Sequence, residues 1–182
     1  MIDLAHLPGY DDPFGLMAAL HVRLQHRCAL LERLAEHVRE HGSDEGARAT
    51  AAHVMRMFDQ DCPMHHEDEE EDLFPLLNSA TPPAELARLA ELVAVLVAQH
   101  WEMNAAYDAI RPQLETVADG RLGAIDHALV DRLHALCVEH IETEEVELFP
   151  FARAHLGPAA IEQLGRAMAA RRNAPYPDGS SS

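Results

Sequence analysis

Apolar residues recur at three- and four-residue spacing in four long stretches of the chain, which is the pattern of amphipathic α-helices. In the first stretch Asp12 is predicted to cap a helix that begins at Pro13, and Gly42 is predicted to end it. Ser43 is predicted to start a second helix that continues to about Leu77. Each of these helices is long enough to cross a small domain.

Two prolines interrupt the second stretch. Pro63 and Pro75 lack a backbone N–H and are expected to bend this helix or to break it locally. A turn at residues 78–83 follows, where Thr81 is expected to cap the third helix. The third helix has the most regular apolar row, and residues 119–123 form the next predicted turn.

The fourth helix is predicted to end at Gly157-Pro158, where a short fifth helix begins. Four long helices with short connections predict an all-α, up-down-up-down four-helix bundle with a short C-terminal helix. The expected divisions are an N-terminal arm (1–12), the bundle (13–157), the C-terminal helix (158–172) and a disordered tail (173–182) rich in Pro, Gly and Ser.

One motif occurs once in each half of the chain. His65 and His140 each begin the pattern His-x3-Glu-x4-Phe-Pro, whose carboxylates are Glu69 and Glu144. Residues four apart on an α-helix lie on the same face, so each copy directs an imidazole and a carboxylate toward one point. A single His-x3-Glu also arises by chance in acidic helices, but two copies on inward-facing rows predict a shared site.

A lone histidine precedes each motif at a similar distance, His21 in the first half and His100 in the second. Both lie among apolar residues on the inward-facing row of their helix, where a single histidine is usually a hydrogen-bonded core residue. Together with the motifs they place four imidazoles and two carboxylates at one level of the core. Buried carboxylates are costly without compensation, and no Arg lies on these rows at that level. Histidine and carboxylate ligands suit iron, manganese or zinc, and carboxylates on facing helices can bridge two ions.

These motifs, spread over about residues 13–155, resemble those of the bacterial hemerythrin-like (HHE cation-binding) family. The resemblance implies a non-haem di-iron centre with two bridging carboxylates and a bridging oxo or hydroxo group, with manganese and zinc as less favoured ions. By position it implies four terminal imidazole ligands and two bridging carboxylates: His21, His65, His100 and His140, with Glu69 and Glu144.

The chain departs from the oxygen-carrying hemerythrins that it resembles. They have a second histidine one turn after the lone histidine of helix three, and here that position is Asn104. Four imidazoles, two bridging carboxylates and a bridging oxygen leave about two positions of an octahedral ion pair open. This count favours reaction with O2, peroxide or NO, or sensing of them, over reversible O2 carriage. His66 is a possible further ligand, but at about 100° from His65 it is expected to face outward.

Several polar and sulfur-bearing residues are expected on one side of the metal layer. They are Cys28, Cys62, Cys137, Tyr107, Gln25 and Asn104. The cysteines and the tyrosine are open to two interpretations, as buried packing residues or as a second shell that supplies reducing equivalents or senses oxidants. The acidic runs around residues 67–72 and 142–147 are expected to be mainly solvated surfaces.

The formal net charge of −17 excludes whole classes of partner. All 14 basic residues are Arg, and the acidic surface repels nucleic acid and anionic membranes. The sequence has no apolar stretch of membrane-spanning length and no secretory signal, and its three cysteines show no disulfide-like spacing. These features predict a cytoplasmic protein in a reducing compartment.

Three functions remain open at this point. The first is a di-iron protein that senses, scavenges or reduces a small diatomic or peroxide ligand. The second is a non-catalytic metal-binding or iron-handling protein. The third is a structural metal site, zinc included, that only stabilises the bundle.

Overall fold

A computed structural model describes residues 8–121 and 123–177, and all of the regular structure in these ranges is helical. The first and third long helices are single α-helices, α1 (Pro13–His41) and α5 (Leu86–Ala118). The second is a continuous rod of α2 (Glu45–Arg56), η1 (Met57–Asp61), α3 (Cys62–Glu67), η2 (Asp68–Leu73) and α4 (Phe74–Ala80). The fourth is a rod of α6 (His127–Thr143), η3 (Glu144–Leu148) and α7 (Phe149–His155), and α8 (Pro158–Arg171) follows it.

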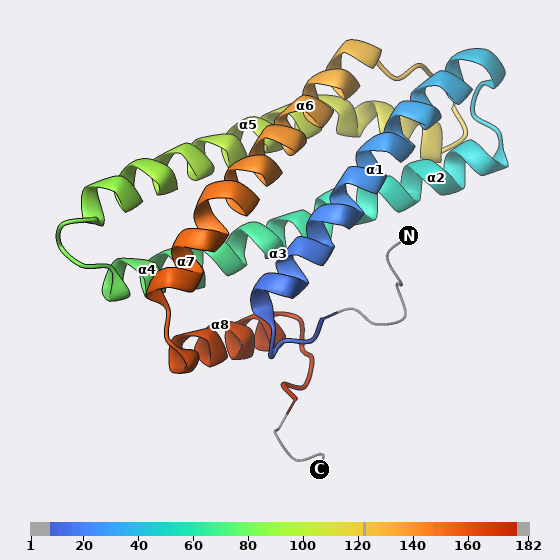
Figure 1. Ribbon diagram of the computed structural model, residues 1–182. Helices are drawn as coiled ribbons and strands as arrows, with labels where there is room; N and C mark the ends of the chain where they lie inside the picture. The colour runs from blue at the N-terminus through green and yellow to red at the C-terminus, as the bar shows by residue number, and fades with distance from the viewer. Residues whose placement is uncertain (1–7, 122, 178–182) are drawn as a thin grey trace.

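The long helices pack as an antiparallel bundle in which each contacts two neighbours (Figure 1). α1 packs against α2 and α6, and α5 packs against the same two helices from the other side. α8 crosses the end of the bundle where α1 begins and α7 ends. The predicted four-helix bundle with a short C-terminal helix is therefore confirmed.

The predicted ends of α1 are found where expected. The Asp12 carboxylate accepts a hydrogen bond from the Gly15 N–H at 3.0 Å, and Pro13 occupies the first helical position. Gly42 follows the helix with a φ of 75°, a conformation that strongly favours glycine.

Two other predicted caps are wrong. Asp44, rather than Ser43, caps α2, because its carboxylate accepts the Ala47 N–H at 2.7 Å. Thr81 ends α4 in an extended conformation, and α5 begins only at Leu86. The residue before a proline disfavours the helical region, and two prolines follow Thr81 directly.

The arm predicted over residues 1–12 and the tail predicted over 173–182 lie partly outside the described residues, as does Leu122 in the predicted turn. Their expected boundaries stay predictions.

The prolines of the motif helices stand next to wide π-helical turns rather than breaks. The Phe74 N–H reaches back five residues to the Glu69 carbonyl, and the Phe149 N–H does the same to Glu144. Each of these turns immediately precedes a proline, which cannot donate to the ordinary ladder. The local disruption expected from Pro75 therefore takes the form of a wider turn within a continuous rod.

A polar layer divides the buried core into two apolar clusters. Leu24 and Met103 belong to the cluster on one side of this layer, and Met17 and Leu96 belong to the cluster on the other side. Both clusters are buried, so water is excluded from the layer on both sides.

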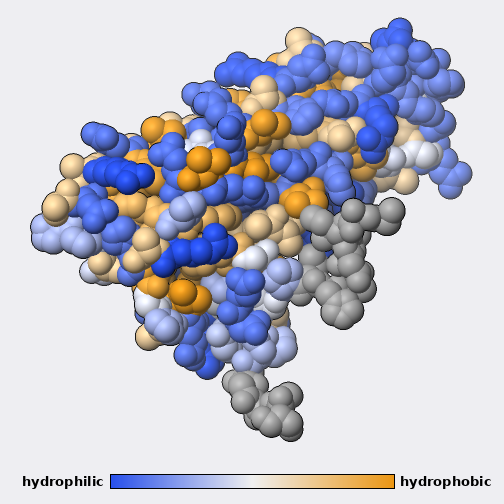
Figure 2. Space-filling model, viewed as in Figure 1, coloured by the Kyte–Doolittle hydropathy of each residue, from blue (hydrophilic) through white to orange (hydrophobic). Residues whose placement is uncertain are grey.

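Hydrophilic residues cover much of the outer surface of the bundle, with hydrophobic residues exposed between them (Figure 2). No helix in the described ranges is both long and apolar enough to cross a membrane.

α8 is attached to the first motif by buried ion pairs. Asp68 is fully buried and accepts hydrogen bonds from Arg172 at 2.6 and 3.0 Å, and Arg171 reaches the same carboxylate. Gly165 permits the close approach of the chain before α1, because a Cβ there would lie 1.9 Å from the Tyr10 carbonyl oxygen. The acidic run at 67–72, expected to be solvated, is thus partly an internal contact.

We expect the substitution Asp68→Asn to lower the free energy of unfolding by about 3 kcal/mol, because it leaves the largely buried Arg172 guanidinium without its charged partner and removes one of the carboxylates that pair with Arg171. Urea denaturation of the metal-free chain measures this loss. Glu71→Gln is the matched control, since Glu71 contacts the same Arg171 but is 68% exposed, and we expect a loss below about 1 kcal/mol. Equal losses in the two variants would contradict the assignment.

Candidate metal centre

Seven side chains from all four long helices meet in the polar layer between the two apolar clusters. Each is 7% exposed or less. They are His21 of α1, His65 and His66 of α3, Glu69 of η2, His100 of α5, His140 of α6 and Glu144 of η3. All six of the predicted ligands are therefore brought together, and His66 joins them.

The Glu69 carboxylate lies between two imidazoles from different helices. Its Oε1 is 3.6 Å from His65 Nε2, and its Oε2 is 3.2 Å from His100 Nε2. The two oxygens therefore face different histidines.

Glu144 repeats this arrangement in the other half of the layer. Its Oε1 is 2.7 Å from His140 Nε2, and its Oε2 is 2.8 Å from His21 Nε2 and 3.7 Å from His65 Nε2. Ligands at right angles on an ion with bonds of about 2.1 Å lie about 3 Å apart, so these separations suit shared coordination. Each carboxylate thus divides its oxygens between a His21/His65 group and a group that contains His100 and His140.

The expectation that His66 faces outward is wrong. The His66 ring stacks on His100 with centroids 3.9 Å apart, and the nitrogens of His66, His100 and His140 that could bind an ion lie within 4.8 Å of one another. The rod that carries α3 has two neighbours in the bundle. His65 faces α1, and His66, about 100° further around the helix, faces α5.

In the described part of the chain, no arginine side chain pairs with either of the two buried carboxylates, Glu69 and Glu144. Within residues 8–121 and 123–177, no hydrogen bond reaches any of their four oxygens, and their ion-pair partners are imidazoles. Burial, together with the charge of Glu144, raises the pKa of Glu69 well above its usual value. Burial opposes ionisation of Glu144 as well, but the surrounding imidazoles outweigh it and hold the pKa of Glu144 well below its usual value. A cation between the carboxylates would remove this conflict.

Burial also keeps most of the imidazoles in the form that binds metals. It lowers the pKa of His66 to about 2 and that of His100 to about 4, with neighbouring imidazoles adding to both shifts. The pKa of His65 is lowered by burial too. For His21 burial is outweighed by Glu144 and Glu145, which raise its pKa. A neutral imidazole has a lone pair available for an ion.

Two exposed glutamates hold the lone histidines in place. His100 Nδ1 lies 2.6 Å from Glu70 Oε1, and His21 Nδ1 lies 3.0 Å from Glu145 Oε1. An Nδ1–H donated to a carboxylate leaves Nε2 free for an ion and fixes the ring orientation. The sequence analysis missed this role, although a signal exists, since each of these glutamates directly follows a motif carboxylate.

The motif histidines differ in their outer partners. His140 Nδ1 lies 3.3 Å from Gln99 Oε1, and Gln99 in turn donates to Thr143 Oγ at 3.3 Å. His65 Nδ1 is buried and has no partner among the described residues. Gln99 was also missed by the sequence analysis.

Three of the residues expected around the centre are not directed at it. Gln25 and Asn104 are exposed. The Tyr107 hydroxyl donates to Asp59 at 2.7 Å, and the Tyr107 ring stacks on Phe58. None of the three contacts the seven buried side chains through a hydrogen bond in the described structure.

The three cysteines are buried and unpaired by disulfides. Burial raises the pKa of Cys62, and a hydrogen bond with Cys137 together with burial raises the pKa of Cys28. The thiolate is the reactive form, so these shifts favour packing over redox reactivity. Cys62 lines a small cavity beside His65.

Comparison with known proteins agrees with this geometry. A family profile described as "Hemerythrin HHE cation binding domain" matches residues 12–166. An uncharacterized protein of Haemophilus influenzae is 27% identical over 163 residues, which cover 90% of this chain and 91% of that protein.

Proposed function

Because the chain belongs to the hemerythrin HHE cation-binding family, we propose that its centre holds two iron ions and binds a small oxidant such as O2, peroxide or NO. The observation that carries this proposal is the division of the oxygens of Glu69 and Glu144 between two imidazole groups. A site for one ion would need no carboxylate that faces two sets of ligands.

The proposed ligands follow from these contacts. His21 and His65 would hold one ion, His100 and His140 would hold the other, and the two glutamates would bridge them. Mixed imidazole and carboxylate ligands suit iron, and manganese and zinc are the alternatives to be tested.

His66 makes the two ion positions unequal. Its ring lies with His100 and His140, so it would add a third imidazole to their ion. Five imidazoles, two bridging carboxylates and a bridging oxygen would leave about one position of an octahedral pair open, and that position would belong to the ion at His21 and His65. The sequence alone predicted two open positions, and that number favoured reaction over reversible O2 carriage. With His66 as a ligand the number would fall to one, so it would no longer favour reaction.

When bound, an iron pair supplies electrons to the oxidant. Glu70, Glu145 and Gln99 orient the rings of His100, His21 and His140 through their Nδ1 atoms. The apolar clusters on both sides of the layer exclude bulk water. The residues therefore provide a confined, largely buried site in which small neutral molecules are favoured over larger substrates.

We expect about two irons per chain after anaerobic purification, with near-UV absorption from a bridging oxygen on oxidation. His65→Ala and His140→Ala should each lose most of this iron, because each removes a ligand from a different ion. His26→Ala is the matched control, since His26 is exposed on α1, and it should retain the iron. Metal analysis that finds one zinc per chain, or no loss in either variant, would contradict the di-iron proposal.

Rapid mixing of the reduced protein with O2, peroxide or NO separates the functional classes. A spectral change that matches oxidant consumption supports the proposal. A bound iron pair that reacts with none of the three indicates an iron-handling or structural role instead.

His66→Phe should open a second exchangeable position while it preserves the ring stack on His100. We expect the oxidised wild-type centre to bind about one azide and the variant about two, because the ion at His100 and His140 loses its third imidazole. Spectroscopic azide titration measures the stoichiometry. Equal stoichiometry in the two proteins would remove His66 from the ligand set.

Glu145→Gln should weaken iron binding by about tenfold, because an amide is a poorer acceptor for His21 Nδ1–H than a carboxylate. Competition with a chelator measures this affinity. Glu147→Gln, an exposed change two residues further along the same rod, should leave the affinity unchanged. A similar loss in both variants would indicate a general charge effect rather than orientation of His21.

A further inference from the structure

The two motif histidines differ in whether their Nδ1 atom has a hydrogen-bond partner. Gln99, which directly precedes His100, gives His140 Nδ1 its hydrogen-bond partner. The corresponding residue of the first half, directly before His21, is Leu20, which has no acceptor in its side chain. His65 Nδ1 is accordingly buried without a partner among the residues that the structure describes.

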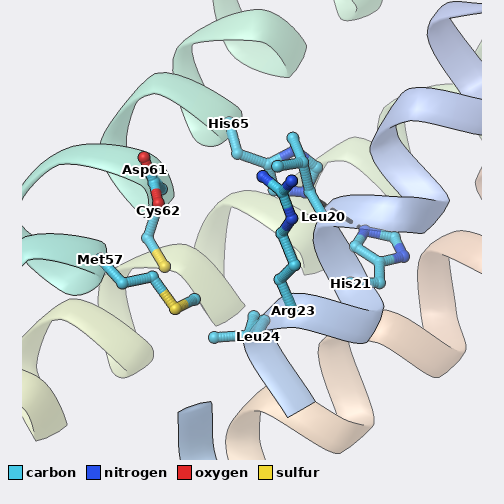
Figure 3. Close-up of a pocket in the computed structure, with 8 residues that line it drawn as sticks. All are labelled: Leu20, His21, Arg23, Leu24, Met57, Asp61, Cys62 and His65. Atoms are coloured by element: carbon cyan, nitrogen blue, oxygen red, sulfur yellow. Dashed lines mark hydrogen bonds between the residues drawn. The ribbon is translucent and has the colours of Figure 1, made fainter. Parts of the chain in front are cut away.

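A cavity of about 20 Å³ lies beside the ring that carries this unsupported nitrogen. Leu20, His21 and Leu24 of α1 line it from one side, and Met57, Cys62 and His65 of the second rod line it from the other (Figure 3). Roughly 10–15 Å³ of such space suffices for one water molecule.

The cavity is also reachable from the surface. The exposed side chains of Arg23 and Asp61 complete its lining, so its outer end borders solvent. A small polar molecule can therefore enter without displacement of the apolar clusters.

We propose that this cavity is a binding subsite for one neutral, water-sized hydrogen-bond acceptor, which takes the Nδ1–H of His65 and does for this histidine what Gln99 does for His140. The inference rests on the proposed function, because a metal on Nε2 fixes the ring proton on Nδ1. Water and hydrogen peroxide share the required chemistry. The subsite would place such a molecule behind a ligand of the ion that retains an open position.

Crystals of the zinc-loaded chain, before and after a hydrogen peroxide soak, test this subsite without redox chemistry. We expect one ordered molecule within hydrogen-bond distance of His65 Nδ1. Water in both crystals would support the subsite and identify its guest as solvent, whereas peroxide after the soak would identify it as open to the oxidant. A dry cavity, or a guest that makes no hydrogen bond to His65, would overturn the proposal.

Leu20→Gln and Leu20→Met form the matched pair of variants. Leu20 is only half-buried, so both changes should be tolerated. The amide of Leu20→Gln should displace the guest and slow exchange of the His65 Nδ1 proton with water by at least about tenfold, as measured by NMR of the zinc-loaded chain. Leu20→Met should retain the guest and the wild-type exchange rate. Equal exchange rates in the two variants would overturn the proposal.

The metal content of the chain distinguishes failure of the proposed function from failure of the subsite. A wild-type chain that retains no iron after anaerobic purification would refute the proposed function. A zinc-loaded centre with a dry cavity would refute the subsite alone.

Discussion

The burial of Glu69 and Glu144 without a guanidinium partner is the constraint on which the rest of the structure depends. Two carboxylates in one buried layer oppose each other's ionisation and lose their hydration, and the surrounding imidazoles compensate Glu144 but not Glu69. The apolar clusters on both sides of the layer keep water from relieving this cost. A bound cation pair would therefore contribute to the stability of the bundle as well as to its chemistry.

Wide helical turns allow this layer to form. The buried row of the second rod continues in steps of four residues through Leu73 and Leu77, and in an ideal α-helix each such step drifts by about 40°. The π-helical turns at Glu69 and Glu144 absorb this drift, and the prolines after them fix where the ladder widens. The same local feature therefore keeps the apolar row in the core and presents the carboxylates to the centre.

Helical periodicity and the repeated motif were sufficient to predict the bundle and six of the seven residues that meet in its polar layer. They could not predict His66, because its position depends on which neighbouring helix lies 100° away from His65. Gln25 and Asn104 were misplaced for a related reason. The inward rows continue from the lone histidines in steps of three, to Leu24 and Met103, so the residues at steps of four rotate out to solvent.

The differences between the two halves matter more for chemistry than their similarity. Where the first half has His66, the second has Ile141, and where the second has Gln99, the first has Leu20. Both exchanges act in the same direction, because His66 would give the His100/His140 group a further ligand, whereas Leu20 leaves His65 without the hydrogen-bond acceptor that Gln99 gives His140. With the proposed ligands, a duplicated scaffold would thus provide two inequivalent positions, one suited to hold its ion firmly and the other suited to exchange a ligand.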